Sequence, residues 1–319
     1  MNILVPLNHT AHLEGFLEAG ATEFYMGFYD IAWEERFGTY HDINRLSGFR
    51  SNANRYSFEE LLNELDQIQK NLQTKKASIY ITLNASGYSK EQMKELSYYM
   101  EQLKEHGIRG VIVSNLELTI LAKETKIPAV VSTIAGVYNA ETVKIYQEFG
   151  ASRVILPRDL STEEIAQIMQ QVPDMEYEIF LMRNGCNFSD SNCLGFHRKE
   201  LCSVCGSLSK AKVDFQCPPS MKHNTKVNHN LYSHEFHEQA CGLCGIYRFL
   251  KLGVSACKIV GRSEDYEVIC QDVRYVSDNI RIAKTCKNEE EYLQQMRFPE
   301  NKDEICTNGF SCYYPEIRF

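Results

Sequence analysis

The sequence lacks the signals that direct a chain into or across a membrane. Its first residues, MNILVPLNHT, contain neither a basic segment nor the apolar run and small-residue cleavage site of a secretory signal. No window reaches the 18 or more consecutive apolar residues of a membrane span. We therefore expect a cytoplasmic protein that has no membrane partner.

Familiar catalytic sets are missing as well. The stretch HEFHE (234–238) places its histidines three residues apart rather than four, so it does not form the HExxH helix of the zinc peptidases. No Ser–His–Asp or Cys–His nucleophile set is evident. The formal net charge of −8 does not favour a nucleic acid partner, because nonspecific affinity for nucleic acid comes from clustered Lys and Arg, although a local basic groove would permit one.

Short apolar, β-branched runs alternate with longer amphipathic runs along most of the chain. The expected strands span residues 2–7, 23–28, 78–84, 110–115, 129–134, 153–158, 177–182 and 256–261. The helical patterns that follow them span residues 11–20, 58–72, 90–107, 116–126, 140–150, 162–172, 245–253 and 263–284. Eight βα units predict an α/β fold closed into a (β/α)8 TIM-like barrel. An open doubly wound sheet is the second choice, and no GxGxxG or Walker loop follows a strand to support it.

One connection interrupts this alternation. Residues 183–240, after the seventh strand, are rich in Cys, Asn, Ser, Lys and His and show no clear periodicity. A loop of this length without structure of its own is usually functional or disordered. We divide the chain into residues 1–182 with the first seven strands, the cysteine-rich metal-binding insertion 183–240, the closing part of the barrel at 241–285, and a C-terminal tail at 286–319. Because loops after strands lie at the carboxyl face of a barrel, the insertion should lie over its mouth.

Polar side chains lie at the ends of several expected strands. Asn84 and Arg158 end the third and sixth strands, Ser132 lies in the fifth, and Lys258 and Arg262 lie in and after the eighth. Each of them alone could be an ordinary helix cap or turn former. Together, three cations at one mouth suit an anionic small-molecule substrate or donor, since Arg binds carboxylate or phosphate through two hydrogen bonds.

The chain contains 12 cysteines, and in a reducing cytosol such a set predicts metal ligands or catalytic thiols before disulfides. CSVCG (202–206) and CGLCG (241–245) resemble zinc knuckles, but the 35 residues between the pairs exceed the common spacing. Buried, unreactive thiols are expected at three further positions, Cys257, Cys270 and Cys286. Cys186 and Cys193, with six residues between them, fit no zinc knuckle, so disulfides, structural zinc and an iron–sulfur cluster remain open.

The spacing of Cys186 and Cys193 carries a resemblance. The stretch EIFLMRNGCNFSDSNC (178–193) resembles the signature of the collagenase-like peptidases, family 32 of the unassigned peptidases, in which a strand of the form ExF leads to C-x6-C. Further similar segments occur in the same order along nearly the whole chain. They are residues 3–28, similar to the first βαβ unit of that family, ITLN (81–84), residues 132–165 with an Arg–acid pair, and GVSACKIVGR (253–262), similar to GV-x3-KIEGR.

The resemblance implies a [4Fe–4S] cluster held by four cysteines. Better understood members take part in oxygen-independent hydroxylation of RNA bases or of the ubiquinone ring, with prephenate implicated as the oxygen source in some. Carried over by position, Cys186 and Cys193 match the C-x6-C ligands, Cys202 fits the third ligand and Cys217 the fourth. Cys205 could replace either of the last two. Four thiolates from one loop suit a cubane cluster.

The cysteines of the second knuckle, Cys241 and Cys244, lie outside this pattern and could bind a separate zinc ion with other cysteines. The C-terminal pair, Cys306 and Cys312, belongs to neither pattern, and the segment that contains it could cover the barrel or reach a partner.

The resemblance also implies roles for the residues at the barrel mouth. We expect Arg158 and Lys258 to be catalytic, and Asn84, Ser132 and Arg262 to bind the substrate. The anionic substrate or donor would then lie beneath the cluster. A second member of the family is a further candidate partner.

The sequence departs from the family pattern at two places, and it leaves two other functions open. Met182-Arg183 stands where His-Gly is usual, and Val260 replaces the Glu of KIEGR. We also expect the chain to lack the extra C-terminal domain of the longer, RNA-modifying members. The alternatives to an iron–sulfur hydroxylase are a metal-dependent peptidase or peptide-modifying enzyme, and a zinc-stabilised accessory protein.

Overall fold

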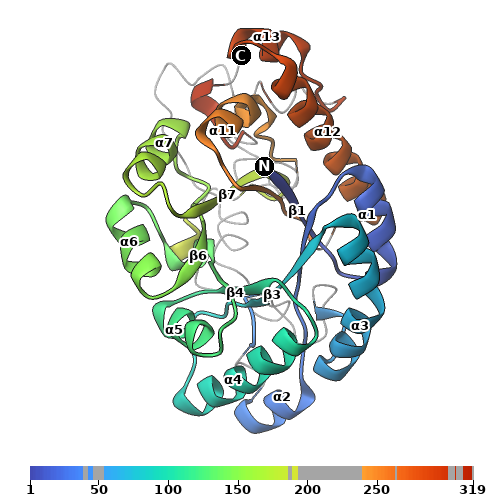
Figure 1. Ribbon diagram of the computed structural model, residues 1–319, viewed down its shortest axis with the longest axis vertical. Coiled ribbons are helices and arrows are strands. Elements are labelled where there is room, and N and C mark those ends of the chain that lie inside the picture. The colour runs from blue at the N-terminus through green and yellow to red at the C-terminus, as the bar shows by residue number, and fades with distance from the viewer. Residues whose placement is uncertain are drawn as a thin grey trace, which may run out of the picture.

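The computed structural model describes most of the chain. The described residues are 1–38, 42–45, 54–185, 189–192, 239–262, 264–300, 306 and 312–317. Within them, eight strands form a closed barrel in chain order, in which each strand is parallel to its neighbours and β8 pairs with β1 (Figure 1). The predicted (β/α)8 barrel is therefore confirmed.

The strands and helices alternate around the barrel. The strands are β1 (Asn2–Pro6), β2 (Glu23–Met26), β3 (Ser78–Leu83), β4 (Gly110–Val113), β5 (Ala129–Val131), β6 (Ala151–Ile155), β7 (Glu176–Met182) and β8 (Ala256–Ile259). The helices are α1 (Leu13–Ala19), α2 (Ile31–Phe37), α3 (Phe58–Lys75), α4 (Lys90–Glu105), α5 (Leu116–Glu124), α6 (Ala140–Glu148), α7 (Thr162–Gln171), α11 (Ile246–Leu252), α12 (Tyr266–Thr285) and α13 (Glu289–Gln295). Short 3-10 turns include η1 (Thr10–His12), η3 (Thr133–Ala135), η4 (Asp190–Asn192), η6 (Leu243–Gly245) and η7 (Pro315–Ile317).

The structure differs from the expected elements at two helices and at the ends of several strands, since β2, β4, β5, β6 and β8 each end two or three residues earlier than expected. The short helices α2 and α13 were not predicted; each has seven residues and begins after an Asp or Asn cap, Asp30 and Asn288. Strand β5 is shorter than expected, since it ends at Val131 and the chain then turns into η3. Ser132 therefore follows the strand instead of lying in it.

Local sequence signals explain where the covering helices begin. Helix α3 starts at a capping box, in which the Ser57 side chain accepts a hydrogen bond from the backbone N–H of Glu60 and the Glu60 side chain bonds back to the Ser57 backbone. The pairs Ser89–Gln92 and Ser161–Glu164 start α4 and α7 in the same way. These starts place the apolar stripe of each helix against the barrel.

The long connection after β7 lies mostly outside the described residues, which include only 183–185, 189–192 and 239–240 of the expected insertion. The C-terminal segment 312–317 packs beside the end of β7, where the Tyr314 hydroxyl donates a hydrogen bond to the Phe180 carbonyl at 2.8 Å. In the described part of the chain, no helix is both long and apolar enough to cross a bilayer.

Candidate active site at the carboxyl end of the barrel

Four of the five predicted site residues outside the cysteines gather at the carboxyl ends of the strands. Asn84 and Ser132, after β3 and β5, are both buried, and the Asn84 Nδ2 donates to the Ser132 Oγ at 3.3 Å. The Asn84 Oδ1 accepts a hydrogen bond from the backbone N–H of Arg45 at 3.1 Å. Arg158 follows β6 and Arg262 follows β8. The structure thus brings residues from four separate strands to one mouth.

Arg158 forms an ion pair at this mouth. Its Nε lies 2.7 Å from Oδ2 of Asp190, and Arg45 NH1 lies 2.9 Å from the other carboxylate oxygen. Asp190 is 1% exposed. Burial alone would raise the pKa of this carboxyl group, but the two guanidinium groups outweigh it and lower the pKa. Neither Arg45 nor Asp190 was predicted to belong to the site.

Arg262 has a different environment. The Asn8 Nδ2 donates a hydrogen bond to the Arg262 carbonyl, which brings the ends of β1 and β8 together. Among the described residues, Arg262 NH1 and Asn8 Oδ1 are buried without a hydrogen-bond partner. Burial lowers the pKa of Arg262 to about 10. The unpaired donor of Arg262 suits an anionic oxygen of a ligand, and the unpaired acceptor of Asn8 suits a hydroxyl or N–H group.

Lys258 lies deeper than the other predicted residues, inside the barrel. Its Nζ is 3.1 Å from Oε1 of Glu178 and 4.1 Å from the centre of the Tyr25 ring. Burial lowers the pKa of Lys258, although the charge of Glu178 opposes this shift. Arg153 and Glu23 continue the same network toward the amino ends of the strands. Lys258 therefore belongs to a buried ion network, and its catalytic role stays a prediction.

The predicted cluster ligands cannot be placed. Cys186, Cys193, Cys202 and Cys217 lie outside the described residues, as does the alternative ligand Cys205. Among the residues that are described, no three His, Cys, Asp or Glu side chains are arranged to hold a metal ion.

Four described cysteines gather near the end of β7. The backbone of Cys241 forms an antiparallel β-bridge with Met182 and a parallel β-bridge with Cys312. Burial raises the pKa of the Cys241 thiol, and nearby Cys244, Cys312 and Cys306 raise it further. Sequence reasoning had left Cys306 and Cys312 without a place. It is the backbone pairing of the C-terminal segment that brings them to the second CxxC pair.

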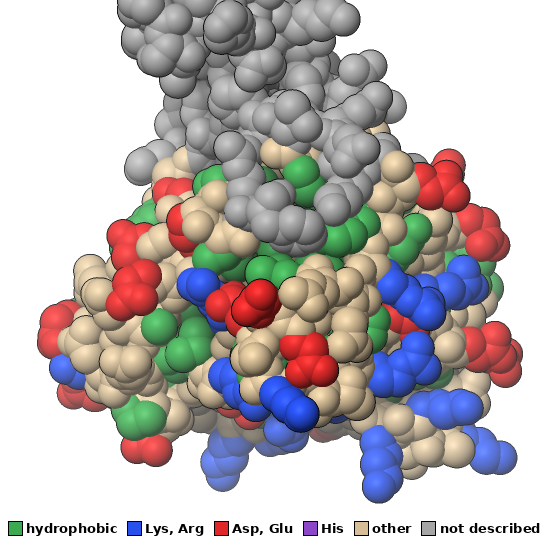
Figure 2. Space-filling model, turned by 90° about the horizontal axis from the view of Figure 1, so that it is seen from above, with side chains coloured by type: hydrophobic (Ala, Val, Ile, Leu, Met, Phe, Trp, Pro, Cys, Tyr) green, Lys and Arg blue, Asp and Glu red, His purple; other side chains and the backbone are tan. Residues whose placement is uncertain are grey.

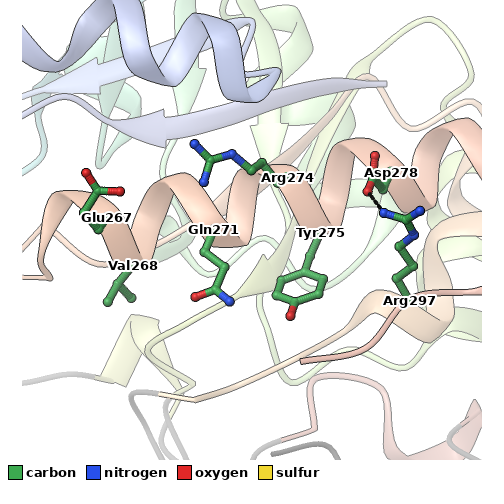
Figure 3. A pocket seen from close by; sticks show the side chains of 7 residues that line it. All are labelled: Glu267, Val268, Gln271, Arg274, Tyr275, Asp278 and Arg297. Carbon is green, nitrogen blue, oxygen red and sulfur yellow. Dashed lines mark hydrogen bonds and ion pairs between the residues drawn. The ribbon is translucent and has the colours of Figure 1, made fainter. Parts of the chain in front are cut away.

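A separate open groove lies on the outer face of α12 (Figure 3). It is lined by Glu267, Val268, Gln271, Arg274, Tyr275, Asp278 and Arg297. At one end of the row of lining side chains, Arg297 forms an ion pair with Asp278. The groove contains none of the predicted site residues, so the mouth of the barrel remains the candidate site.

Comparisons with known proteins agree with the predicted family. The model of peptidase family U32 matches residues 8–318. The tRNA hydroxylation protein P of Escherichia coli (strain K12) is 36% identical over 117 residues, which are 36% of this chain and 26% of that protein. The tRNA hydroxylation protein P1 of Bacillus subtilis (strain 168) is 30% identical over 150 residues, 46% of this chain and 34% of that protein.

A protein of Methanocaldococcus jannaschii described as an uncharacterized protease is 26% identical over 197 residues, 60% of this chain and 43% of that protein. A solved structure of a U32 peptidase is 17% identical, with a TM-score of 0.43, and the match covers 57% of this chain and 69% of that one. The chain spans less than half of the length of the three curated relatives. Because the family model covers nearly the whole sequence, this protein belongs to peptidase family U32.

Proposed function

We propose that this protein is an iron–sulfur enzyme that takes part in the oxygen-independent hydroxylation, or a related modification, of a base in RNA. Membership of the family and the similarity to proteins named for tRNA hydroxylation support this proposal. A small aromatic molecule is the alternative substrate for the same chemistry.

The observation that carries the proposal is that two buried polar atoms at the mouth have no hydrogen-bond partner among the described residues. Leaving a buried donor or acceptor without a partner costs about 1–3 kcal/mol. Arg262 NH1 and Asn8 Oδ1 are both in this state among the described residues. An anionic substrate or donor that carries a hydroxyl group would satisfy both atoms, so binding such a ligand offsets a cost that is already built into the fold.

The cluster would be held by Cys186, Cys193, Cys202 and Cys217, with Cys205 as a substitute for either of the last two. Thiolates are the protein ligands that [4Fe–4S] clusters take, and when bound such a cluster transfers single electrons. Residues 183–185 and 189–192, which flank Cys186, lie at the barrel mouth, and this position supports the proposal that the cluster would lie beside the substrate. A zinc ion at the second CxxC pair is a further part of the proposal.

Charges of both signs are distributed over the described surface. In Figure 2, Lys and Arg side chains lie along the lower edge and on the right of the face shown, and Asp and Glu side chains lie on both flanks and near its centre. Together with the net charge of −8, this distribution favours a local contact with RNA phosphates over binding across a broad surface.

Nucleoside analysis tests the proposed function. Transfer RNA from cells with and without the gene would be digested to nucleosides and analysed by mass spectrometry. We expect a nucleoside heavier by one oxygen atom to disappear on deletion and to return with the wild-type gene but not with the Cys186→Ala variant. An unchanged nucleoside profile would contradict an RNA substrate and leave a small aromatic molecule.

The peptidase alternative has less support at the mouth. The described histidines are His9, His12 and His106, and none of these three forms a hydrogen bond to a Ser or Cys side chain. The His9 Nδ1 lies 3.0 Å from the Tyr56 hydroxyl, and the His106 Nδ1 lies 2.7 Å from Asp66. A cleaved peptide product that forms with the cluster removed would favour the peptidase. Protein that binds zinc but shows no catalytic turnover would favour an accessory protein that works with a second family member.

A further inference from the structure

Arg158 contacts the chain on both sides of residues 186–188. Its NH1 donates a hydrogen bond to the carbonyl of Asn184, two residues before Cys186. Its Nε lies 2.7 Å from Oδ2 of Asp190 and its NH2 lies 3.4 Å from Oδ1 of the same carboxylate, four residues after Cys186. One guanidinium group therefore joins the entry and the exit of the segment that contains the first predicted cluster ligand.

The carboxylate of Asp190 is fully used in these contacts. Oδ1 also accepts a hydrogen bond from Arg45 NH1 at 2.9 Å, and Oδ2 accepts one from the Thr133 hydroxyl at 3.2 Å. Arg45 comes from the connection between α2 and α3, Thr133 from the turn after β5 and Arg158 from the loop after β6. The barrel thus holds Asp190 from three separate elements.

The backbone before Cys186 is in a conformation that requires such contacts. Arg183 and Asn184 have φ angles of 65° and 44°, in the left-handed region that favours glycine. The Arg183 side chain pairs with Asp272, and its backbone N–H donates to the Ala240 carbonyl at 2.7 Å. The Tyr313 hydroxyl donates to the Arg183 carbonyl. The usual Gly of the family pattern at position 183 fits this φ angle, and here side-chain contacts hold an Arg in it.

Arg158 has little capacity left for a substrate. Its side chain is 8% exposed, it uses Nε, NH1 and NH2 in the contacts above, and its guanidinium lies 4.2 Å from the centre of the Phe180 ring. Arg45 shares the same carboxylate, so the two cations and one anion leave a single net positive charge. Arg262, by contrast, has no ion pair among the described residues.

We propose that Arg158, Arg45 and Asp190 form a clamp that holds Asn184 and Asp190, on either side of residues 186–188, at the barrel mouth. We also propose that Arg262 is the residue that binds the anionic group. Arg158 is then a positioning residue rather than a catalytic one. The role of Cys186 as a cluster ligand rests on the proposed function, but the clamp itself rests only on the contacts of described residues.

Hydrogen–deuterium exchange of the full chain, purified without oxygen, tests the clamp. The variants are Asp190→Asn, which keeps the size of the side chain, and Arg158→Lys, which cannot make two parallel hydrogen bonds. Arg36→Gln is the matched control, since it breaks an exposed Arg–Glu pair. We expect amide exchange in residues 183–192 to rise at least tenfold in both variants, with exchange in α3 unchanged. The control should behave as the wild type.

The double variant adds a test that a general loss of stability would not pass. Because both substitutions break the same contact, its exchange should be no faster than that of the more affected single variant. If the Asp190→Asn variant fails to fold, the Arg45→Gln variant replaces it. Arg45 is partly exposed, and its substitution removes only one of the contacts that hold Asp190. Wild-type exchange rates in these variants would overturn the proposal.

Iron release to a chelator, measured on the same samples, separates this proposal from the proposed function. We expect release to be about tenfold faster in the Asp190→Asn variant than in the wild type. If the wild-type protein contains no iron but the variants still show faster amide exchange, the clamp is supported and the cluster proposal is overturned. Iron bound in every variant, with unchanged exchange and unchanged release, would keep the cluster and overturn the clamp.

Discussion

Replacing Arg153 with Met should strongly destabilise the barrel. Arg153 lies in β6, with its side chain 5% exposed. Its NH1 is 2.6 Å from Oε2 of Glu23 and 3.5 Å from Oε2 of Glu178, its NH2 is 3.0 Å from Oε1 of Glu23, and its Nε is 3.0 Å from Oε2 of Glu176. The substitution Arg153→Met keeps an unbranched side chain in this space but removes the charge.

The size of the effect follows from what each carboxylate retains. Glu178 keeps its contact with Lys258 at 3.1 Å, and Glu176 is half exposed, so water can solvate it. Glu23 keeps only the amide of Asn2 at 2.7 Å among its described partners. Breaking a buried pair by removing one partner costs about 3–5 kcal/mol. We therefore expect the free energy of unfolding to fall by about this amount, most of it from Glu23.

Urea unfolding checks this magnitude. The chain has one tryptophan, Trp33, which is 2% exposed, so its fluorescence should report unfolding. Arg36→Met is the control, because its pair with Glu95 is exposed and such pairs contribute at most about 1 kcal/mol. The gap between Arg153→Met and the wild type should narrow as the pH falls, since a carboxyl group without its cation is buried more easily when neutral. A loss below about 1 kcal/mol at pH 7 would refute the reasoning.

Three further predictions concern the mouth and the barrel interior below it. Arg262→Met should weaken the binding of citrate, measured by titration calorimetry, by about 10–100-fold, because hydrogen bonds to charged groups contribute about 1.5–3 kcal/mol; equal affinity would contradict an anion site there. Lys258→Met should abolish RNA modification with an unchanged circular dichroism spectrum, and activity within about twofold of the wild type would remove Lys258 from the catalytic set. Burial alone would raise the pKa of Asp190, but two guanidinium groups lower it. Its stabilisation is therefore fully present well above the unfolded pKa of about 3.9 and is lost progressively as the pH falls from that value through the lowered folded pKa. In hydrogen–deuterium exchange, the backbone amides of residues 189–192 should stay protected from pH 8 to pH 5. Loss of this protection within that range would contradict the ion pairs of Asp190.

The barrel could be predicted because each strand carries its own local signal. Runs such as Gly110–Val113 and Ala129–Val131 are short, apolar and β-branched, and an amphipathic helix follows each. The helices Ile31–Phe37 and Glu289–Gln295 were missed because seven residues show too little of the helical period. Ser132 was placed inside a strand because the β-branched residues Thr133 and Ile134 continue the pattern past Val131, although the chain has already turned there.

The mouth residues could be predicted only in part. The strand-end rule found Asn84, Arg158 and Arg262 without any structure. The partner of Arg158, Asp190, could not be found, because Asp190 lies 32 residues after Arg158 and 145 residues after Arg45, and the folded loops alone bring the three together. One signal was present, since Asp190 is the single acidic residue between the two cysteines of the C-x6-C motif.

The central claim is that Cys186 and Cys193 bind an iron–sulfur cluster. The most direct measurement is iron, zinc and acid-labile sulfide analysis, with a visible spectrum, on protein purified without oxygen, alongside the Cys186→Ala and Cys193→Ala variants. We predict about four iron and four sulfide per chain, with both lost in each variant. Zinc without sulfide, retained in Cys186→Ala, would contradict the claim and show that the CxxC pairs hold a structural ion instead.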